Sequence, residues 1–254
     1  MTLDALYKNI VASGFWLACL AGSAVAQVQD GGRPAVTGVL ELYTSQGCNS
    51  CPQADALLGV YAQRSDLVAL TLPVDYWDYL GWKDTFASPK FTARQRAYAK
   101  ERGDGRIYTP QIVVNGAMHL VGSNAADIDK VIAKSAAKFA AGRVPLTVRV
   151  EGDRLIIEAG DMVAGSGPRD ATIWLAVIQK EAEVPIKTGE NRGKSLKYFN
   201  IVRSLSPVGM WTGKAAKFEI VRDAVKLPGT QGCAVLLQSG AAGPIIAASM
   251  LPSF

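Results

Sequence analysis

The chain has 254 residues, 49% of them hydrophobic, and a formal net charge of +5. This length and composition predict one large or two ordinary domains with sizeable hydrophobic cores. The lysines and arginines are scattered and form no run of about five like charges, so we interpret them as solvated surface and expect no nucleic-acid partner.

Residues 1–26 have the pattern of a cleaved signal peptide. An apolar stretch at 10–20 precedes Ala-Val-Ala at 24–26, the small-residue pattern of a cleavage site, so we expect cleavage before Gln27. The stretch is shorter than the roughly 20 residues that a spanning helix needs, and a retained membrane anchor is the alternative. We therefore expect a periplasmic or secreted protein with no stable membrane insertion after cleavage.

Cleavage would remove Cys19 and leave three cysteines, Cys48, Cys51 and Cys233. An odd number argues against a framework of several disulfides. A Cys48–Cys51 pair is the simplest arrangement, and it can persist as a disulfide in an oxidising compartment. We expect Cys233, which lies in an apolar run, to be a buried thiol.

The first predicted elements follow a polar, glycine-rich leader at 27–35. Residues 36–43 predict a strand, and Pro52 to Tyr61 predict a helix because apolar residues recur there at three- and four-residue steps. The continuous apolar run at 67–74 is typical of a buried strand. This order predicts a βαβ unit with two parallel strands.

The cysteine pair, separated by Asn49 and Ser50, stands where the first strand meets the helix. A helix N-terminus has free N–H groups and a partial positive charge, which favour a thiolate. Such placement lowers a cysteine pKa from about 8.5 to roughly 3.5–7.5. We therefore predict redox chemistry, in which the more exposed Cys48 attacks and Cys51 resolves the mixed disulfide. An inert disulfide or a metal-binding pair is the alternative.

An aromatic segment at 75–82 should be irregular. Its Tyr76, Trp77 and Trp82 either line a groove for a peptide or apolar substrate or cap the core. The next helix should begin after the N-cap Ser88 and end at Gly103.

Residues 107–120 predict a hairpin around Asn115-Gly116, the strongest short signal for a type I′ turn. A last helix is predicted at 125–141, with Ser123 or Asn124 as its N-cap. Residues 36–142 thus predict an α/β domain with a mixed sheet and helices on both faces.

After residue 142 the hydrophobic period changes to two. About seven short strands over about 110 residues, separated by turn residues, predict an all-β antiparallel sandwich-like domain at 143–254. A polar loop with Glu190, Asn191, Arg192 and Lys194 is either a solvated hairpin or a surface that faces the first domain or a partner. The oligomeric state is left open.

Several stretches carry a family resemblance. Cys48-Asn49-Ser50-Cys51 after a strand, Thr109-Pro110 before a hairpin and a closing helix resemble the thioredoxin fold. More narrowly, the chain resembles the secreted thioredoxin-like family called domain of unknown function 1223, to which no firm activity attaches. The matching stretches are 42–48, 75–82, 108–111, 189–193 and 200–203, and members of the family span nearly the whole mature chain.

The resemblance implies roles for three more residues. Pro110 is expected to be a cis-proline that faces the disulfide, with the backbone of Thr109 free to pair with substrate. Glu41 is expected to accept the proton of the resolving thiol, with its pKa raised by desolvation. The alternatives are a trans proline and an exposed or ion-paired carboxylate. One departure from typical thioredoxins is Gly47, which stands where they carry tryptophan.

Two function classes follow. The first is an exported thiol–disulfide oxidoreductase that acts on protein or small-molecule thiols and disulfides without a cofactor. The second is a non-catalytic binding module, for a metal or a protein partner, in which the cysteines are structural or ligating. His119, the only histidine, could join two thiolates in a metal site, but a lone histidine near a strand is more often structural, so we predict no metal.

Overall fold

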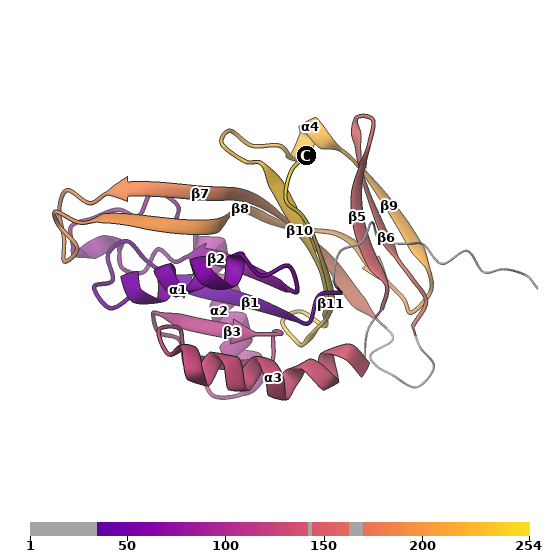
Figure 1. Ribbon diagram of the computed structural model, residues 1–254, viewed down its shortest axis with the longest axis horizontal. Helices are drawn as coiled ribbons and strands as arrows, with labels where there is room; N and C mark the ends of the chain where they lie inside the picture. The colour runs from indigo at the N-terminus through magenta and orange to yellow at the C-terminus, as the bar shows by residue number, and fades with distance from the viewer. Residues whose placement is uncertain (1–34, 142–143, 163–169) are drawn as a thin grey trace, which may run out of the picture. The chain divides into compact units, whose positions relative to one another are not determined.

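The computed structural model describes residues 35–141, 144–162 and 170–254. The predicted signal peptide at 1–26 and positions 27–34 of the predicted leader lie outside these residues. A mixed eight-stranded sheet, a separate three-stranded antiparallel sheet and helices make up the described part (Figure 1). None of the described helices is long and apolar enough to cross a membrane.

The predicted βαβ unit is confirmed. Strands β1 (Gly38–Thr44) and β2 (Leu67–Pro73) pair in parallel, and helix α1 (Pro52–Ala62) connects them. Every residue of both strands is buried, because both faces of this part of the sheet are covered. Helix α1 begins directly after Cys51, and its first-turn Pro52 removes an N–H that has no partner within the helix anyway.

The aromatic segment is largely irregular, with one short 3₁₀ helix, η1 (Asp78–Leu80). Helix α2 (Pro89–Arg102) has the predicted ends. The Ser88 hydroxyl accepts a hydrogen bond from the Lys90 backbone N–H at 3.3 Å, and Gly103 terminates the helix with φ +75°.

The predicted hairpin consists of β3 (Gln111–Val114) and β4 (Met118–Val121). Asn115 and Gly116 both have positive φ, 51° and 65°, as a type I′ turn requires. Helix α3 (Ala125–Ala141) follows. The side-chain oxygen of Asn124 caps it by accepting from the backbone N–H of Asp127.

All seven predicted C-terminal strands are present. The three-stranded sheet contains β5 (Leu146–Glu151), β6 (Arg154–Ala159) and β9 (Ala216–Val221). The other four are β7 (Ala171–Pro185), β8 (Ser195–Trp211), β10 (Gly232–Ser239) and β11 (Ile245–Leu251). The short helix α4 (Arg222–Val225) was not predicted, and β7 and β8 are much longer than expected, forming one long hairpin (Figure 1).

The eight-stranded sheet runs through both predicted domains, in the order β11-β10-β7-β8-β2-β1-β3-β4. Strand β8 joins β2 in parallel at Thr71 and Ile201. The Thr71 hydroxyl donates to the Phe199 carbonyl at 2.7 Å, and the Asn200 amide donates to the Ala69 carbonyl at 3.0 Å. Four of the predicted sandwich strands therefore extend the first sheet. The boundary predicted at 142/143 lies outside the described residues, which all belong to one compact unit, Arg33–Phe254.

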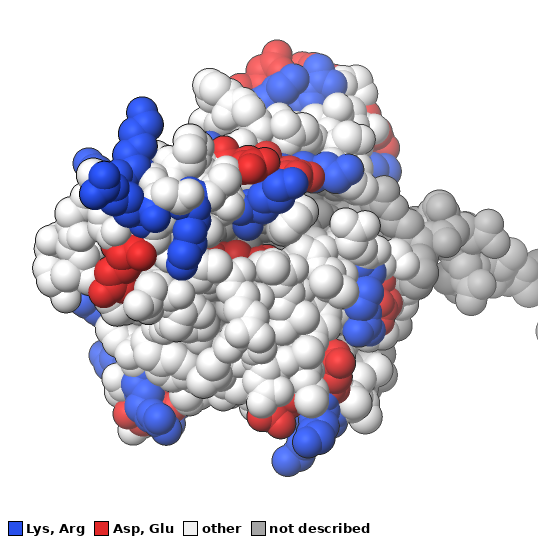
Figure 2. Space-filling model, turned by 60° about the vertical axis from the view of Figure 1, so that its left-hand side comes forward, with Lys and Arg blue, Asp and Glu red and all other residues white. Residues whose placement is uncertain are grey.

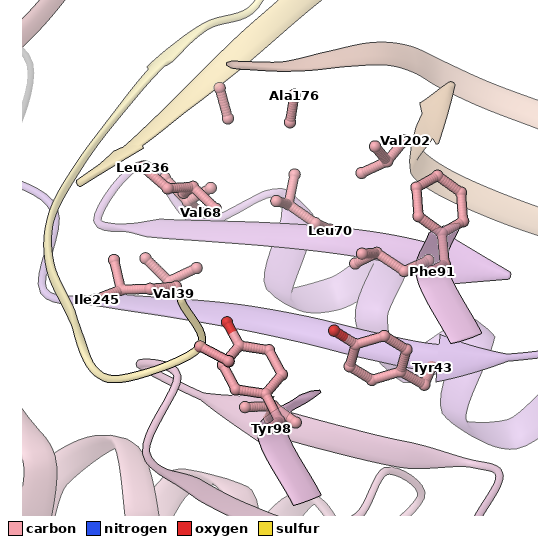
Figure 3. Packing of buried hydrophobic residues seen from close by; sticks show 14 of the residues in the cluster. Val39, Tyr43, Val68, Leu70, Phe91, Tyr98, Ala176, Val202, Leu236 and Ile245 are labelled. Carbon is pink, nitrogen blue, oxygen red and sulfur yellow. The ribbon is translucent and has the colours of Figure 1, made fainter. Parts of the chain in front are cut away.

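A hydrophobic cluster explains this continuity. It joins side chains of β1, β2 and α2 to side chains of β7, β8, β10 and β11, so both halves of the chain exclude water from the same core (Figure 3). The labelled members are Val39, Tyr43, Val68, Leu70, Phe91, Tyr98, Ala176, Val202, Leu236 and Ile245.

Strand β1 separates two clusters by its alternation. Val39 and Tyr43 point into the cluster that contains α2, whereas Leu40 and Leu42 pack with residues of α1 and α3 on the opposite face. A further cluster lies between the three-stranded sheet and strands β7, β10 and β11, and this part resembles the predicted sandwich.

Candidate disulfide site

Cys48 and Cys51 form a disulfide at the N-terminus of α1, which confirms the predicted pairing. The two sulfurs lie 2.11 Å apart and the two Cα atoms 5.4 Å apart. Cys51 is the N-cap residue, and its carbonyl accepts the backbone N–H groups of Ala54 and Asp55 at 2.8 and 3.0 Å. Ser50, on the exposed side of the loop, has its hydroxyl 3.4 Å from the Cys48 sulfur.

Both cysteines are buried, with exposed fractions of 1% for Cys48 and 0% for Cys51. The solvent exposure expected for Cys48 is therefore not found in this oxidised form, in which the two cysteines are almost equally buried. Two long-range segments account for the difference by contacting the disulfide loop: the aromatic segment and the loop between β7 and β8.

Gln46 fastens the aromatic segment to the disulfide loop. Its backbone N–H donates to the Asp84 carboxylate at 2.8 Å, and its side-chain oxygen accepts from the Trp82 indole N–H at 2.9 Å. Gly47 permits close approach, since a Cβ at that position would lie 3.2 Å from the Cβ of Trp77. This contact gives a local reason for the departure from the usual tryptophan before the first cysteine.

The three aromatic residues predicted to bind substrate are half-buried and cap cores. Tyr76 and Trp77 pack against the cluster of Figure 3, and Trp82 packs against a smaller cluster that includes Tyr198. This placement agrees with the alternative that these side chains cover the core. Tyr79, at 80% exposure, is the aromatic residue of the segment that solvent reaches most.

Asn191 was not predicted as a site residue, yet it touches the disulfide loop directly. Its side chain is fully buried, and its amide nitrogen donates to the carbonyls of Gln46 and Cys48 at 3.0 and 2.9 Å. The Lys194 ammonium donates to the Asn191 side-chain oxygen at 2.9 Å. The polar loop therefore faces the first predicted domain, which was one of its two expected placements.

The Thr109–Pro110 bond is cis, as the family resemblance implied. Pro110 lies on the α1 side of β1: a Cβ added to Gly122 would meet Leu42 at 2.7 Å, Ala54 at 3.3 Å and Pro110 at 3.5 Å. The Pro110 carbonyl accepts from the Gly122 backbone N–H at 3.0 Å. Thr109, the expected substrate contact, is partly buried.

Glu41 lies on the other face of β1, away from α1 and the disulfide. It forms a buried ion pair with Arg94, whose Nε lies 2.7 Å from the carboxylate, and it accepts a hydrogen bond from the Tyr98 hydroxyl. The structure therefore does not bring Glu41 to the cysteines. The reason is the period of two, which places residues 40 and 42 toward α1 and residue 41 away from it.

Asp55 is the buried acid that the structure does bring to the cysteines. It lies one helical turn after Cys51, on the same helix face, and no described residue donates a well-formed hydrogen bond to its carboxylate. Burial raises the pKa of Asp55 well above its ordinary value; the nearby Thr44 hydroxyl lowers it and the charge of Asp84 raises it further. The sequence signal was slight, because an acid in the first turn also complements the helix dipole.

Asp84 is a second buried acid at this site. Burial raises its pKa to about 6, although its oxygens accept backbone N–H groups of Gln46, Phe86 and Ala87. The pKa of Tyr198 is also raised, by burial and then by the charges of Asp55 and Asp84. These groups are thus close enough to interact beside the disulfide loop.

His119 and Cys233 stand apart from the site. The His119 ring contacts Asp104, Tyr108 and Gln111, and within the part of the chain that the structure describes no three His, Cys, Asp or Glu side chains gather as a metal site. Cys233 is a buried free thiol, as predicted, and burial raises its pKa to about 12.

Two solved structures are similar to this chain. A protein from Agrobacterium tumefaciens, known from a crystal structure, is 35% identical with a TM-score of 0.76, and the match covers 86% of this chain and 95% of that one. A protein of Porphyromonas gingivalis named HBP35 is 13% identical with a TM-score of 0.56, covering 86% and 76%, and shows likeness of fold alone. None of the curated proteins matches.

The family pattern described as protein of unknown function DUF1223 matches residues 39–238, which hold the disulfide, the aromatic segment and the β7–β8 hairpin. The chain belongs to this family.

Proposed function

We propose that this protein is an exported thiol–disulfide oxidoreductase in which Cys48 and Cys51 cycle between dithiol and disulfide. One observation carries the proposal: the disulfide stands at a helix N-terminus with the buried carboxyl group of Asp55 one turn away. The helix end favours a thiolate, and a buried acid with a raised pKa is a recurrent feature of proton-transfer sites.

In the reducing direction the Cys48 thiolate attacks one sulfur of a substrate disulfide. The substrate S–S bond breaks, the second substrate sulfur leaves as a thiolate, and a mixed disulfide forms on Cys48. The Cys51 thiol then loses its proton and attacks the Cys48 sulfur, which releases the first substrate sulfur. The substrate gains two electrons and the protein loses two, ending in the Cys48–Cys51 disulfide. The oxidising direction is the reverse.

We assign the proton of Cys51 to Asp55 rather than to Glu41. A raised pKa brings the proton affinity of a carboxylate closer to that of a thiol, so that proton transfer between them costs less free energy. Glu41 already balances the charge of Arg94 on the opposite face of the strand.

We also propose the finer fold and location. The β1-α1-β2 unit, the β3–β4 hairpin, helix α3 and the cis Pro110 together support a thioredoxin-like layout for the first half. A persistent disulfide is compatible with an oxidising compartment, in line with the signal pattern at 1–26. The expected partners are thiols or disulfides of proteins or small molecules.

A specific observation favours the second candidate, a binding module with a structural disulfide. Both cysteines are buried, and buried disulfides are usually inert toward external thiols. The redox potential separates the two candidates. Equilibration with glutathione should give a value between about −270 and −120 mV for an oxidoreductase, whereas a value below about −300 mV would establish a structural disulfide.

Variants test the assigned roles through reduction of a protein disulfide such as that of insulin. Cys48→Ser should abolish turnover, and Asp55→Asn should slow it by roughly 10²–10⁴ with accumulation of the mixed disulfide, because general-base help is lost. Glu41→Gln is the matched comparison. If that variant traps the mixed disulfide and Asp55→Asn does not, the proton belongs to Glu41; full turnover of Cys48→Ser would end the proposal.

A further inference from the structure

The loop that joins β7 to β8, residues 186–194, is here named the hairpin tip. It reaches the disulfide because β8 packs along α1. The packing is close at Gly59, where an added Cβ would lie 2.5 Å from the ring of Phe199. The hairpin therefore follows α1 back to its N-terminus, where the two cysteines lie.

The Asn191 side chain connects the hairpin tip directly to the backbone of Cys48. One amide nitrogen holds the carbonyl of Cys48 and that of Gln46, and the Cys48 carbonyl also accepts the backbone N–H of Cys51 at 3.3 Å. The tip is thus bonded to the turn that carries both sulfurs. Cys48 has an exposed fraction of 1% in this arrangement, so an external thiolate has no direct approach to its sulfur.

Two more contacts hold the tip. The Thr188 hydroxyl donates to the Gly81 carbonyl. Gly189, with φ +77°, lies so close to the aromatic segment that an added Cβ would be 3.2 Å from the Cβ of Trp82. These contacts connect the tip to the same segment that Gln46 fastens to the disulfide loop.

The remainder of the tip is loosely anchored. Apart from Ile186 and Asn191, every tip residue is exposed, including Lys187, Arg192 and Lys194. Figure 2 brings the left-hand side of Figure 1, where the hairpin ends, forward, and basic side chains gather on the upper left of that face. A segment with few buried apolar contacts and a handful of hydrogen bonds opens at low free energy without global unfolding.

We propose that Asn191 controls access to the Cys48–Cys51 disulfide: the closed tip shields the sulfurs, and a thiol reaches Cys48 only when the tip lifts. This inference goes beyond the proposed function, because it holds equally for a structural disulfide. It makes the reduction rate depend on the opening equilibrium of the tip, and it makes bulky reductants, which need a wider opening, slower than small ones.

The test measures reduction of the Cys48–Cys51 disulfide in the full chain by dithiothreitol and by a folded dithiol protein, reduced thioredoxin. In each reaction a reductant thiolate attacks Cys48, and the Cys51 thiolate leaves. The second reductant thiolate then attacks the reductant sulfur of this mixed disulfide, the bond to Cys48 breaks, and Cys48 leaves as a thiolate, so that the reductant ends as a disulfide and the protein as a dithiol. Asn191→Ala should react about tenfold faster, which corresponds to about 1.4 kcal/mol in the opening equilibrium. It should also narrow the rate difference between the two reductants.

Thr188→Val is a second variant, for the case that Asn191→Ala does not fold. It removes only the exposed hydrogen bond from the Thr188 hydroxyl to the Gly81 carbonyl, so we expect it to keep the fold. It should accelerate reduction in the same direction. Ser195→Ala is the matched control: it removes one exposed hydrogen bond of the same hairpin, to Glu183, and touches nothing at the disulfide loop, so its rate should equal that of the parent.

Unchanged rates in both Asn191→Ala and Thr188→Val would overturn the inference. A second outcome would also overturn it: in all three variants the reduction rate rises in proportion to the loss of global stability, measured by urea unfolding, and rises equally for both reductants. This test is independent of the proposed function. If the variants accelerate reduction of the Cys48–Cys51 disulfide but the parent does not reduce protein disulfides, then Asn191 controls access to the disulfide and the protein is not an oxidoreductase.

Discussion

Asp84 should make the protein less stable as the pH rises through its folded-state pKa. This carboxyl group is buried and holds the backbone of Gln46 next to Cys48. Burial raises its pKa from 3.8 to about 6. Between these values the unfolded chain is ionised while the folded chain stays protonated, so the stabilising contribution is full below pH 3.8 and is lost as the pH rises through 6.

The magnitude follows from the shift. About two pKa units at about 1.36 kcal/mol each give about 3 kcal/mol, of which most is lost between about pH 4 and pH 7. Asp84→Asn cannot titrate and serves as the reference. The free energy of urea unfolding of the parent minus that of Asp84→Asn should therefore fall by about 2–3 kcal/mol over this range.

Thr85→Ala is the control for this experiment. It removes the hydrogen bonds between the Thr85 hydroxyl and the Gln46 side chain but keeps the Asp84 carboxyl group. The unfolding free energy of Thr85→Ala should therefore change with pH in parallel with that of the parent. A difference between the parent and Asp84→Asn that is constant with pH, or that grows in favour of the parent at higher pH, would refute the reasoning.

Two further predictions concern packing. Arg94→Ala should cost about 3–5 kcal/mol in unfolding free energy by leaving the buried Glu41 charge without its partner, and a Glu41→Gln/Arg94→Met double variant should recover part of it; equal losses in the single and double variants would contradict a coupled pair. Gly59→Ala should destabilise by about 1–3 kcal/mol, although alanine favours a helix, because the ring of Phe199 occupies the space. In a Phe199→Ala background the same substitution should become stabilising, and thermal unfolding of the four proteins measures both signs.

The local elements of this chain follow from nearby residues. Ser88 and Gly103 bound α2, Asn115-Gly116 makes the turn between β3 and β4, and the apolar run after α1 makes β2. These features depend on caps, turn geometry and hydrophobic period within a few residues, so the sequence states them directly.

The position of Glu41 shows that nearness along the chain is a poor guide to nearness in space. Glu41 stands close before the cysteines, and its acidity suited the expected proton transfer. The alternation of β1, however, already implied that Leu40 and Leu42 share the face of α1 and that Glu41 does not. Asp55, by contrast, lies four residues after Cys51 in helix α1, a spacing that places two side chains on the same helix face.

By itself the sequence determined that the cysteine pair lies between a strand and a helix, and it determined the strands that follow in the second half of the chain. Only the tertiary structure decided that β8 continues the first sheet, and that the Asn191 side chain donates to the carbonyl of a cysteine 143 residues earlier in the chain. Local propensity carries no information on such pairs. Which distant surfaces meet depends on the single arrangement that buries the apolar faces of both halves in one core, and the hairpin tip comes to the disulfide as a consequence of that packing.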